Sequence, residues 1–159
     1  MTKGLAAIKA EFEALKNDPL SAMGIDIGLA NEDDYYNWRV IMMGPKDTPY
    51  QGGIFTLTMK FTDDFPKQPP EVRFKNKIYH INVNSNGHVC INTLNNWRED
   101  PSNKTRICTV LTHIFALFHM QNPDDAYVTH LEEYKNKRES FNKKAREWTQ
   151  KYANIDCVD

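Results

Sequence analysis

The sequence has few cysteines and no long apolar run, and each absence argues against a class of protein. Its 159 residues include three cysteines, Cys90, Cys108 and Cys157, an odd number with no paired spacing. A secreted disulfide framework is therefore disfavoured, and we expect reduced thiols in a reducing compartment. No apolar run approaches the roughly 18–20 residues that a membrane-spanning helix needs, so we expect no membrane partner.

Net charge is also nearly absent, at −1 near neutral pH. The chain therefore has no overall basic field that would attract nucleic acid. Seven Lys and Arg against four Glu occur between His130 and Ala153, but they alternate with apolar positions, which is typical of a solvated helix face. The first 19 residues mix Lys and Glu with apolar positions, unlike a signal peptide. We expect a cytoplasmic location, a nuclear one, or both.

The residues that are present suffice for one packed domain. Apolar residues make up 40% of the chain and aromatic residues 11%, enough to build a hydrophobic core. The length fits a single domain, and no internal repeat or linker divides it. We place the domain at residues 1–153, followed by a short tail, residues 154–159.

Hydrophobic periodicity predicts a helix followed by strands. Apolar residues recur at helical spacing in residues 5–16, and the pattern stops before Pro19. Between Met23 and Phe74 the period changes to two, and turns rich in Gly, Pro, Asn and Asp separate the runs. The alternating residues are Ile25, Ile27, Leu29, Trp38, Val40, Met42, Phe55, Leu57, Met59 and Phe61. Strands joined by short turns predict a four-stranded antiparallel meander.

Residues 76–106 show neither period and contain Cys90. A loop of that length inside a compact domain is usually either functional or disordered. Helical spacing returns in residues 107–119 and again in residues 131–152. The order of helix, four strands, long loop and C-terminal helices predicts an α+β fold with helices packed on a sheet.

The loop around Cys90 carries a recognisable motif. It reads YHINVNSNGHVCINTLNNW from Tyr79 to Trp97, with His80-Ile81-Asn82 upstream of the cysteine. Four further stretches accompany it, namely MGPKDTPYQGGIF (43–55), FPKQPPEVRF (65–74), QNPDDAYV (121–128) and AREWTQKYA (145–153). In this order and spacing the chain resembles the ubiquitin-conjugating enzyme family over nearly its whole length. That family has His-Pro-Asn about eight residues before its active cysteine.

The resemblance implies an activity and the residues that carry it. Cys90 would accept ubiquitin as a thioester from an activating enzyme, and the chain would transfer it to a lysine amine, usually with a ligase. Asn82 would stabilise the oxyanion or hold the active-site loop, because such transfer needs a donor at the developing oxyanion. Asp125 would position the incoming lysine and favour its deprotonation, and His80 would brace the loop.

The resemblance also implies partners. They are ubiquitin, the activating enzyme, a RING, U-box or HECT-type ligase, and lysines of protein substrates. No cofactor is implied, because ATP is consumed by the activating enzyme.

Two other interpretations of Cys90 are less favoured. His80 could act as its base, as in a cysteine protease, but no protease signature surrounds the cysteine, and a strong base there could hydrolyse a stored thioester. A metal site could be drawn from His88, Cys90, Cys108, His113 and His119, but none of these pairs forms CxxC or HExxH. The apolar spacing around Cys108 indicates an inert core position, and Cys157 is expected to be exposed in the tail.

The middle of the motif is Ile81, where the family has proline. Proline would fix φ and remove a donor, whereas isoleucine adds an N–H that must find a partner. If that N–H is unpaired and φ is about −65°, Ile81→Pro should stabilise the fold by roughly 0.4–1 kcal/mol. If the side chain packs and the N–H is bonded, proline should destabilise it.

Other departures from the family concern partners. Ala6 and Ala7 replace basic residues that bind the activating enzyme and ligase, Lys67 replaces a ligase-contacting Phe, and Arg98–Thr105 replaces a compact Ser-Pro-Ala turn. The sequence therefore does not identify the ligase, the substrate or the linkage. Asn92 replaces a common Asp and matches the neddylation branch, so conjugation of another ubiquitin-like modifier is an alternative. A non-catalytic ubiquitin-binding variant is another, which the presence of the cysteine disfavours.

Overall fold

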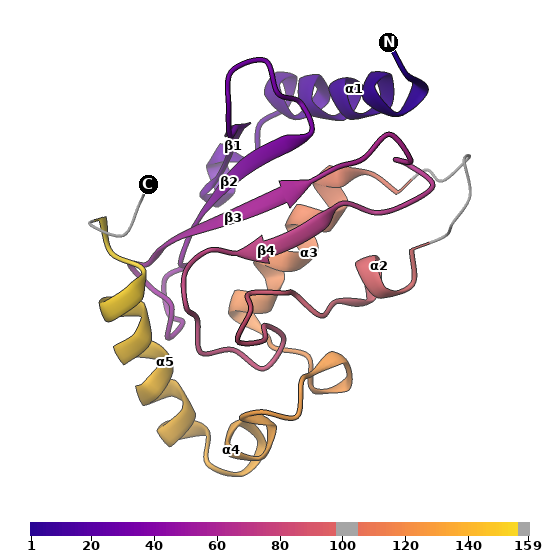
Figure 1. Cartoon of the computed structure of the whole chain (residues 1–159). Coiled ribbons are helices and arrows are strands. Elements are labelled where there is room, and N and C mark those ends of the chain that lie inside the picture. Colours follow the sequence, from indigo (N-terminus) through magenta and orange to yellow (C-terminus); the bar gives the residue numbers. More distant parts are fainter. Residues whose placement is uncertain (98–104, 156–159) are drawn as a thin grey trace.

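A four-stranded antiparallel sheet forms the centre of the computed structural model, which describes residues 1–97 and 105–155 (Figure 1). Its strands are β1 (Ile25–Leu29), β2 (Asn37–Met43), β3 (Ile54–Lys60) and β4 (Glu71–Phe74). Each strand pairs with the next one in the chain. This is the expected meander, since short polar turns separate the alternating runs.

The apolar alternation determines how the strands are paired. Trp38 lies opposite Met59 and Val40 opposite Leu57 across the β2–β3 ladder. None of these four side chains has solvent-exposed surface. Because successive side chains point to opposite faces, a slip of one residue would expose the whole set.

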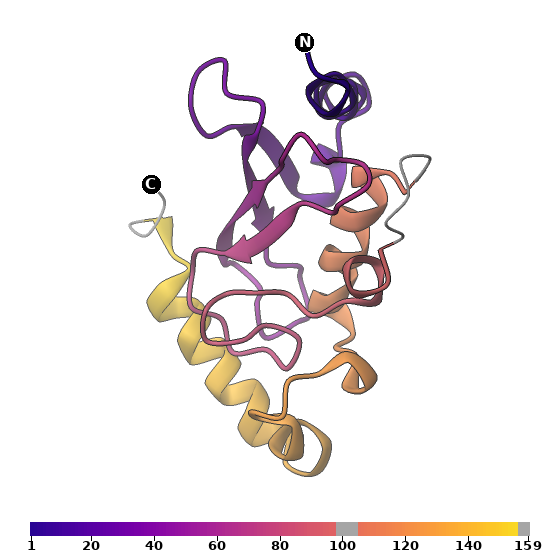
Figure 2. The same cartoon turned by 45° about the vertical axis from the view of Figure 1, so that its right-hand side comes forward.

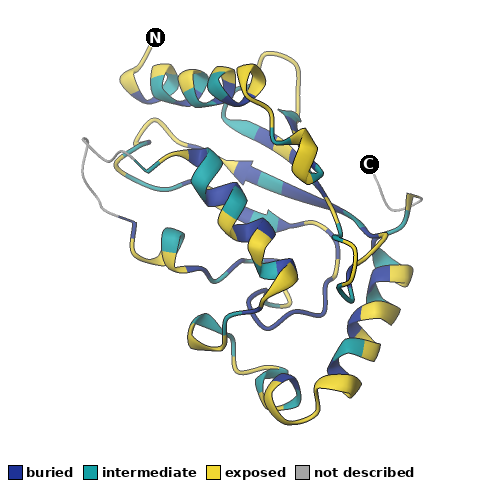
Figure 3. Cartoon of the chain, turned by 180° about the vertical axis from the view of Figure 1, so that it is seen from behind, coloured by how far each residue is buried: buried dark blue, intermediate teal, exposed yellow. Residues whose placement is uncertain are grey.

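Helices cover the apolar face and one end of the sheet. Helix α3 (Ile107–His119) lies behind the sheet in Figure 1 and beside it in Figure 2. Its Phe118 contacts Phe55 of β3, with ring centroids 5.2 Å apart. Helix α1 (Lys3–Asn17) packs through Phe12, whose ring lies 5.2 Å from that of Trp38. Figure 3 shows the result on α1, where buried positions face the sheet and exposed positions face away. The expected α+β fold is confirmed.

The C-terminal residues form two helices, α4 (Leu131–Asn136) and α5 (Arg138–Tyr152). They are separated at Lys137, which has φ −138° and ψ 56°. Helical spacing in the sequence runs through both helices, so this break was not predicted. The end of α5 returns to the sheet, where the N–H of Ile54 donates to the carbonyl of Ala153 at 2.7 Å.

The expected long loop contains more regular structure than its sequence indicates. It includes a one-turn helix, α2 (Asn92–Asn95), and an isolated antiparallel bridge between Val83 and Val89. Gly87 closes the turn of this bridge with φ 86°, and a Cβ atom there would stand 2.2 Å from the carbonyl oxygen of Phe74. Glycine is therefore required at this position. One bridge and one helical turn are too short to leave a period in the sequence.

The structure can be compared with the expectations about membranes, metals and cysteines. Within residues 1–97 and 105–155, no helix is long and apolar enough to cross a membrane. The same described residues contain no group of three His, Cys, Asp or Glu that could hold a metal ion. Cys108 is partly buried against the core. Cys157 lies outside the described residues, as does all of the Arg98–Thr105 segment except Thr105.

Candidate active site

Cys90 follows the short bridged turn and precedes α2. Its backbone N–H donates to the carbonyl oxygen of Asn82 at 2.7 Å, so the cysteine and the asparagine of the motif are joined directly. The Cys90 side chain is a free thiol and is partly exposed. An acyl-accepting thiol needs this accessibility.

His80 is buried, with 3% of its surface exposed. Its Nδ1 accepts the backbone N–H of Asn82 at 3.0 Å, so the proton of the neutral ring lies on Nε2. That nitrogen donates to the carbonyl of Leu117 in α3 at 2.8 Å. Burial lowers the pKa of His80 to about 4, although the bond to Leu117 opposes this shift. His80 is thus neutral near pH 7, and both ring nitrogens bind backbone groups rather than Cys90.

Asn82 is completely buried and paired with a segment 40 residues away. Its Nδ2 donates to the carbonyl oxygen of Asn122 at 2.8 Å, and its Oδ1 accepts the backbone N–H of Asn122 at 2.9 Å. The pair clamps the cysteine loop to the segment after α3. The side-chain amide is thereby directed into the protein.

Asp125 lies one turn beyond this clamp, in the short helix η2 (Pro123–Asp125). The Asn122 side chain organises this turn, since its Oδ1 accepts the N–H of Asp124 at 3.0 Å and its Nδ2 donates to Asp125 at 3.3 Å. Asp125 itself is partly exposed. Asn122 therefore connects two of the residues that the sequence analysis selected, Asn82 and Asp125.

Ile81 lies in a buried hydrogen-bonded chain. Its side chain is fully buried, and its N–H donates to Oε1 of Gln121 at 2.9 Å. Gln121 Nε2 donates to the hydroxyl of Tyr50 at 2.7 Å, and that hydroxyl donates to the carbonyl of Tyr79 at 2.5 Å. The condition under which proline would stabilise the loop, an unpaired N–H, is therefore not met. Of the two alternatives for this position, the structure matches the one in which the isoleucine side chain packs and its N–H is hydrogen-bonded.

Two residues that the sequence analysis did not select lie close to the thiol. Asn95, at the end of α2, donates from Nδ2 to Sγ of Cys90 at 3.2 Å. Tyr127 donates its backbone N–H to the carbonyl of Ile81 at 2.9 Å. Burial raises the pKa of Tyr127, and the charge of the Cys90 thiolate raises it further. No sequence pattern marks Asn95, because its contact with the cysteine arises only once residues 92–95 form a helical turn.

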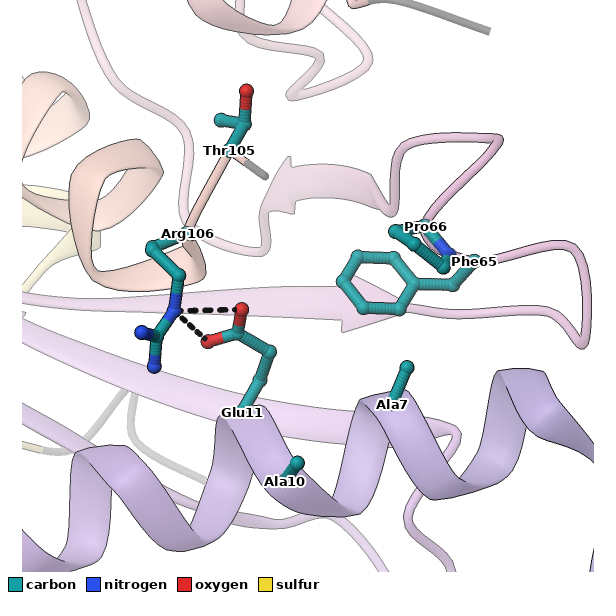
Figure 4. A pocket seen from close by; sticks show the side chains of 7 residues that line it. All are labelled: Ala7, Ala10, Glu11, Phe65, Pro66, Thr105 and Arg106. Atoms are coloured by element: carbon teal, nitrogen blue, oxygen red, sulfur yellow. Dashed lines mark hydrogen bonds and ion pairs between the residues drawn. The ribbon is translucent and has the colours of Figure 1, made fainter. Parts of the chain in front are cut away.

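A separate groove of about 510 Å³ lies between α1, the β3–β4 connection and the start of α3 (Figure 4). Ala7 and Ala10 of α1 form one side, and Phe65 and Pro66 form the other. An ion pair closes one end, in which Arg106 Nε lies 3.0 Å from a carboxylate oxygen of Glu11. Thr105 also lines the groove.

This groove brings together positions that the sequence analysis treated separately. Among the residues that line it are Ala7, Pro66, which precedes Lys67, and Thr105, the last residue of the Arg98–Thr105 segment. Lys67 itself is exposed. Of the positions that depart from the family pattern, Ala7 and Thr105 therefore line one groove, and Lys67 follows a third lining residue, Pro66.

The buried chain at Ile81 leads to a prediction about stability. Ile81→Pro removes a packed side chain and leaves Gln121 Oε1 without its donor, so it should cost about 2–4 kcal/mol of unfolding free energy. Gln121→Leu leaves the Ile81 N–H unpaired and should cost about 1–3 kcal/mol. The double variant removes both partners, so its loss should be smaller than the sum by about 1 kcal/mol. Urea unfolding of the four proteins measures this coupling.

Ile81→Val is the matched control, because it shortens the side chain and keeps the N–H. It should cost about 0.5–1.5 kcal/mol and combine additively with Gln121→Leu. Additive losses in the proline pair would contradict the assigned hydrogen bond.

Comparison with known proteins identifies the family. A sequence model described as "Ubiquitin-conjugating enzyme" matches residues 7–149. A crystal structure from Plasmodium yoelii, provisionally designated a ubiquitin-conjugating enzyme, is similar with a TM-score of 0.82 and 30% sequence identity. That similarity covers 97% of this chain and 97% of the other. The chain belongs to the ubiquitin-conjugating enzyme family.

Proposed function

We propose that this family member is an acyl carrier. Cys90 accepts ubiquitin as a thioester from an activating enzyme and passes it to a lysine amine, usually with a ligase. The observation that carries the proposal is a partly exposed thiol on a loop where the nearby imidazole is fully engaged with backbone groups. A stored thioester needs an accessible sulfur, and it survives longer without a free base that would activate water.

The proposed reaction consists of two acyl transfers. In loading, the Cys90 thiolate attacks the thioester carbon of ubiquitin on the activating enzyme, and the thiolate of that enzyme leaves. In discharge, a neutral lysine amine attacks the new thioester carbon, and the C–S bond then breaks. Cys90 departs as a thiolate, while the nitrogen loses a proton as the amide forms. ATP is consumed upstream, so neither step requires a cofactor on this chain.

Asp125 and Asn82 are suited to different parts of this scheme. The partly exposed carboxylate of Asp125 can attract a lysine side chain and, as a general base, accept the proton that the attacking amine loses. Asn82 has no exposed surface, and both of its side-chain polar atoms bind the backbone of Asn122. Of the two roles that the resemblance implies for Asn82, this geometry supports holding the loop.

The thioester assignment is tested by replacing the cysteine with serine. With activating enzyme, ATP and ubiquitin, the native protein should form an adduct that thiol reductant removes. Cys90→Ser should form an oxygen ester that resists reductant, because an ester has no thiol-exchange route. Gel analysis with and without reductant distinguishes the two. Charging at Cys108 or Cys157 would refute the assignment.

The same assay separates the alternatives. A panel of ubiquitin-like modifiers, each with its own activating enzyme, decides whether ubiquitin is the modifier. Loading with a different modifier alone would favour the branch that Asn92 resembles. Loading with none of them would indicate a non-catalytic variant.

Asp125→Ala should load normally but discharge slowly. Loading requires only the thiolate, whereas discharge requires an amine that is oriented and neutral. Single-turnover discharge to free lysine should fall about tenfold or more and recover partly as pH rises, because more lysine is then deprotonated. A defect that does not change with pH would indicate a purely structural role.

We further propose that a RING or U-box ligase docks over the groove beside α1. The support is that Ala7, Thr105 and Pro66, which precedes Lys67, line one groove of about 510 Å³. The buried ring of Phe65 provides an apolar wall, and the Glu11–Arg106 pair provides a polar end. Aromatic anchors with a polar rim are typical of protein interfaces.

Filling this groove should affect the ligase and spare the chemistry. Ala10→Trp, at an exposed groove position, should lower ligase-stimulated discharge about five- to tenfold by obstructing the partner. Unstimulated discharge of the preformed thioester to free lysine should be unchanged. Glu13→Trp, exposed on the same helix and outside the groove lining, is the control. Equal stimulation of both variants by a panel of ligases would overturn the docking proposal.

A further inference from the structure

The amide of Asn95 lies within hydrogen-bonding distance of the reacting sulfur. Its Nδ2 is 3.2 Å from Sγ of Cys90, and a side-chain amide nitrogen is an obligate donor. Both side chains are accessible from solvent, Asn95 being exposed and Cys90 partly exposed. The amide donor therefore lies next to the sulfur atom that would carry the acyl group.

Helix α2 holds Asn95 in this position. The N–H of Asn95 donates to the carbonyl of Ile91 at 2.9 Å, and Ile91 and Trp97 on either side are buried in the core. The Trp97 indole donates to the carbonyl of Pro66 at 2.9 Å. Thr93 adds a hydrogen bond from α2 to His113 of α3. The turn that carries Asn95 is thus anchored on both sides of the donor.

Other polar groups of the site are engaged elsewhere. The Asn82 amide binds the backbone of Asn122, and the Asn122 amide binds Asp125. The backbone N–H of Cys90 donates to Asn82. Within residues 1–97 and 105–155, the hydrogen bond assigned to the sulfur comes from Asn95.

We infer that Asn95 is a catalytic residue, whose side-chain amide donates a hydrogen bond to the Cys90 sulfur as the thioester C–S bond breaks. A thioester sulfur is a weak acceptor, whereas a thiolate is a strong one, so the bond strengthens as the electron pair of the C–S bond passes to sulfur. An interaction that is stronger in the transition state accelerates the step. This inference rests on the proposed function of Cys90.

The test compares Asn95→Leu and Asn95→Asp with the native chain. Both replacements are close in size to asparagine and lack the N–H donor, and the position is exposed, so thermal unfolding should be little changed. Single-turnover discharge of the preformed thioester to free lysine should fall about three- to tenfold in Asn95→Leu. Asn95→Asp should fall further, because its carboxylate also repels the departing thiolate, and added salt should reduce that extra loss.

Asn96→Leu is the matched control. Asn96 is the next residue, is also exposed, and bonds to Asn92 instead of the sulfur. It should discharge like the native chain. Equal slowing in Asn96→Leu or a native discharge rate in Asn95→Leu would each overturn the inference. A native chain that forms no thioester with any modifier would instead refute the proposed function.

Discussion

Six consecutive residues, 78–83, are buried outside any strand or helix, and this constraint governs the rest of the site. A buried backbone without a ladder must find a partner for each polar group, because an unpaired one costs about 1–3 kcal/mol. Here the partners come from distant segments. Tyr50 binds the carbonyl of Tyr79, Gln121 binds the N–H of Ile81, and Tyr127 binds the carbonyl of Ile81. The loop is therefore rigid because the fold around it supplies these groups.

This arrangement separates support from chemistry. His80 and Asn82 occur in the motif, but their side-chain polar atoms form hydrogen bonds to backbone groups. Cys90, Asn95 and Asp125, in contrast, have exposed surface. A neutral, buried imidazole braces the loop without offering water a base. A thiol that holds a thioester, as proposed for Cys90, benefits from this separation, since hydrolysis competes with transfer.

The replacement of proline by isoleucine illustrates how such a loop tolerates change. Isoleucine introduces a buried N–H, and Gln121 accepts it with a side chain that also binds Tyr50. The new donor is thus absorbed into a chain that ends on the carbonyl of Tyr79. Residues 81 and 121 are thus coupled, because the buried N–H of one is the hydrogen-bond partner of the other.

The sequence alone determined the fold class, the strand faces and the bounds of α3, because burial on one face of a strand or helix repeats with a fixed period. It also determined which residues matched the family motifs. Only the tertiary structure decided what those residues contact. The pairing of Asn82 with Asn122 spans 40 residues, and the approach of Asn95 to Cys90 depends on a single helical turn. Contacts made by irregular segments leave no period in a sequence, since a period arises only where one face of a regular strand or helix is buried.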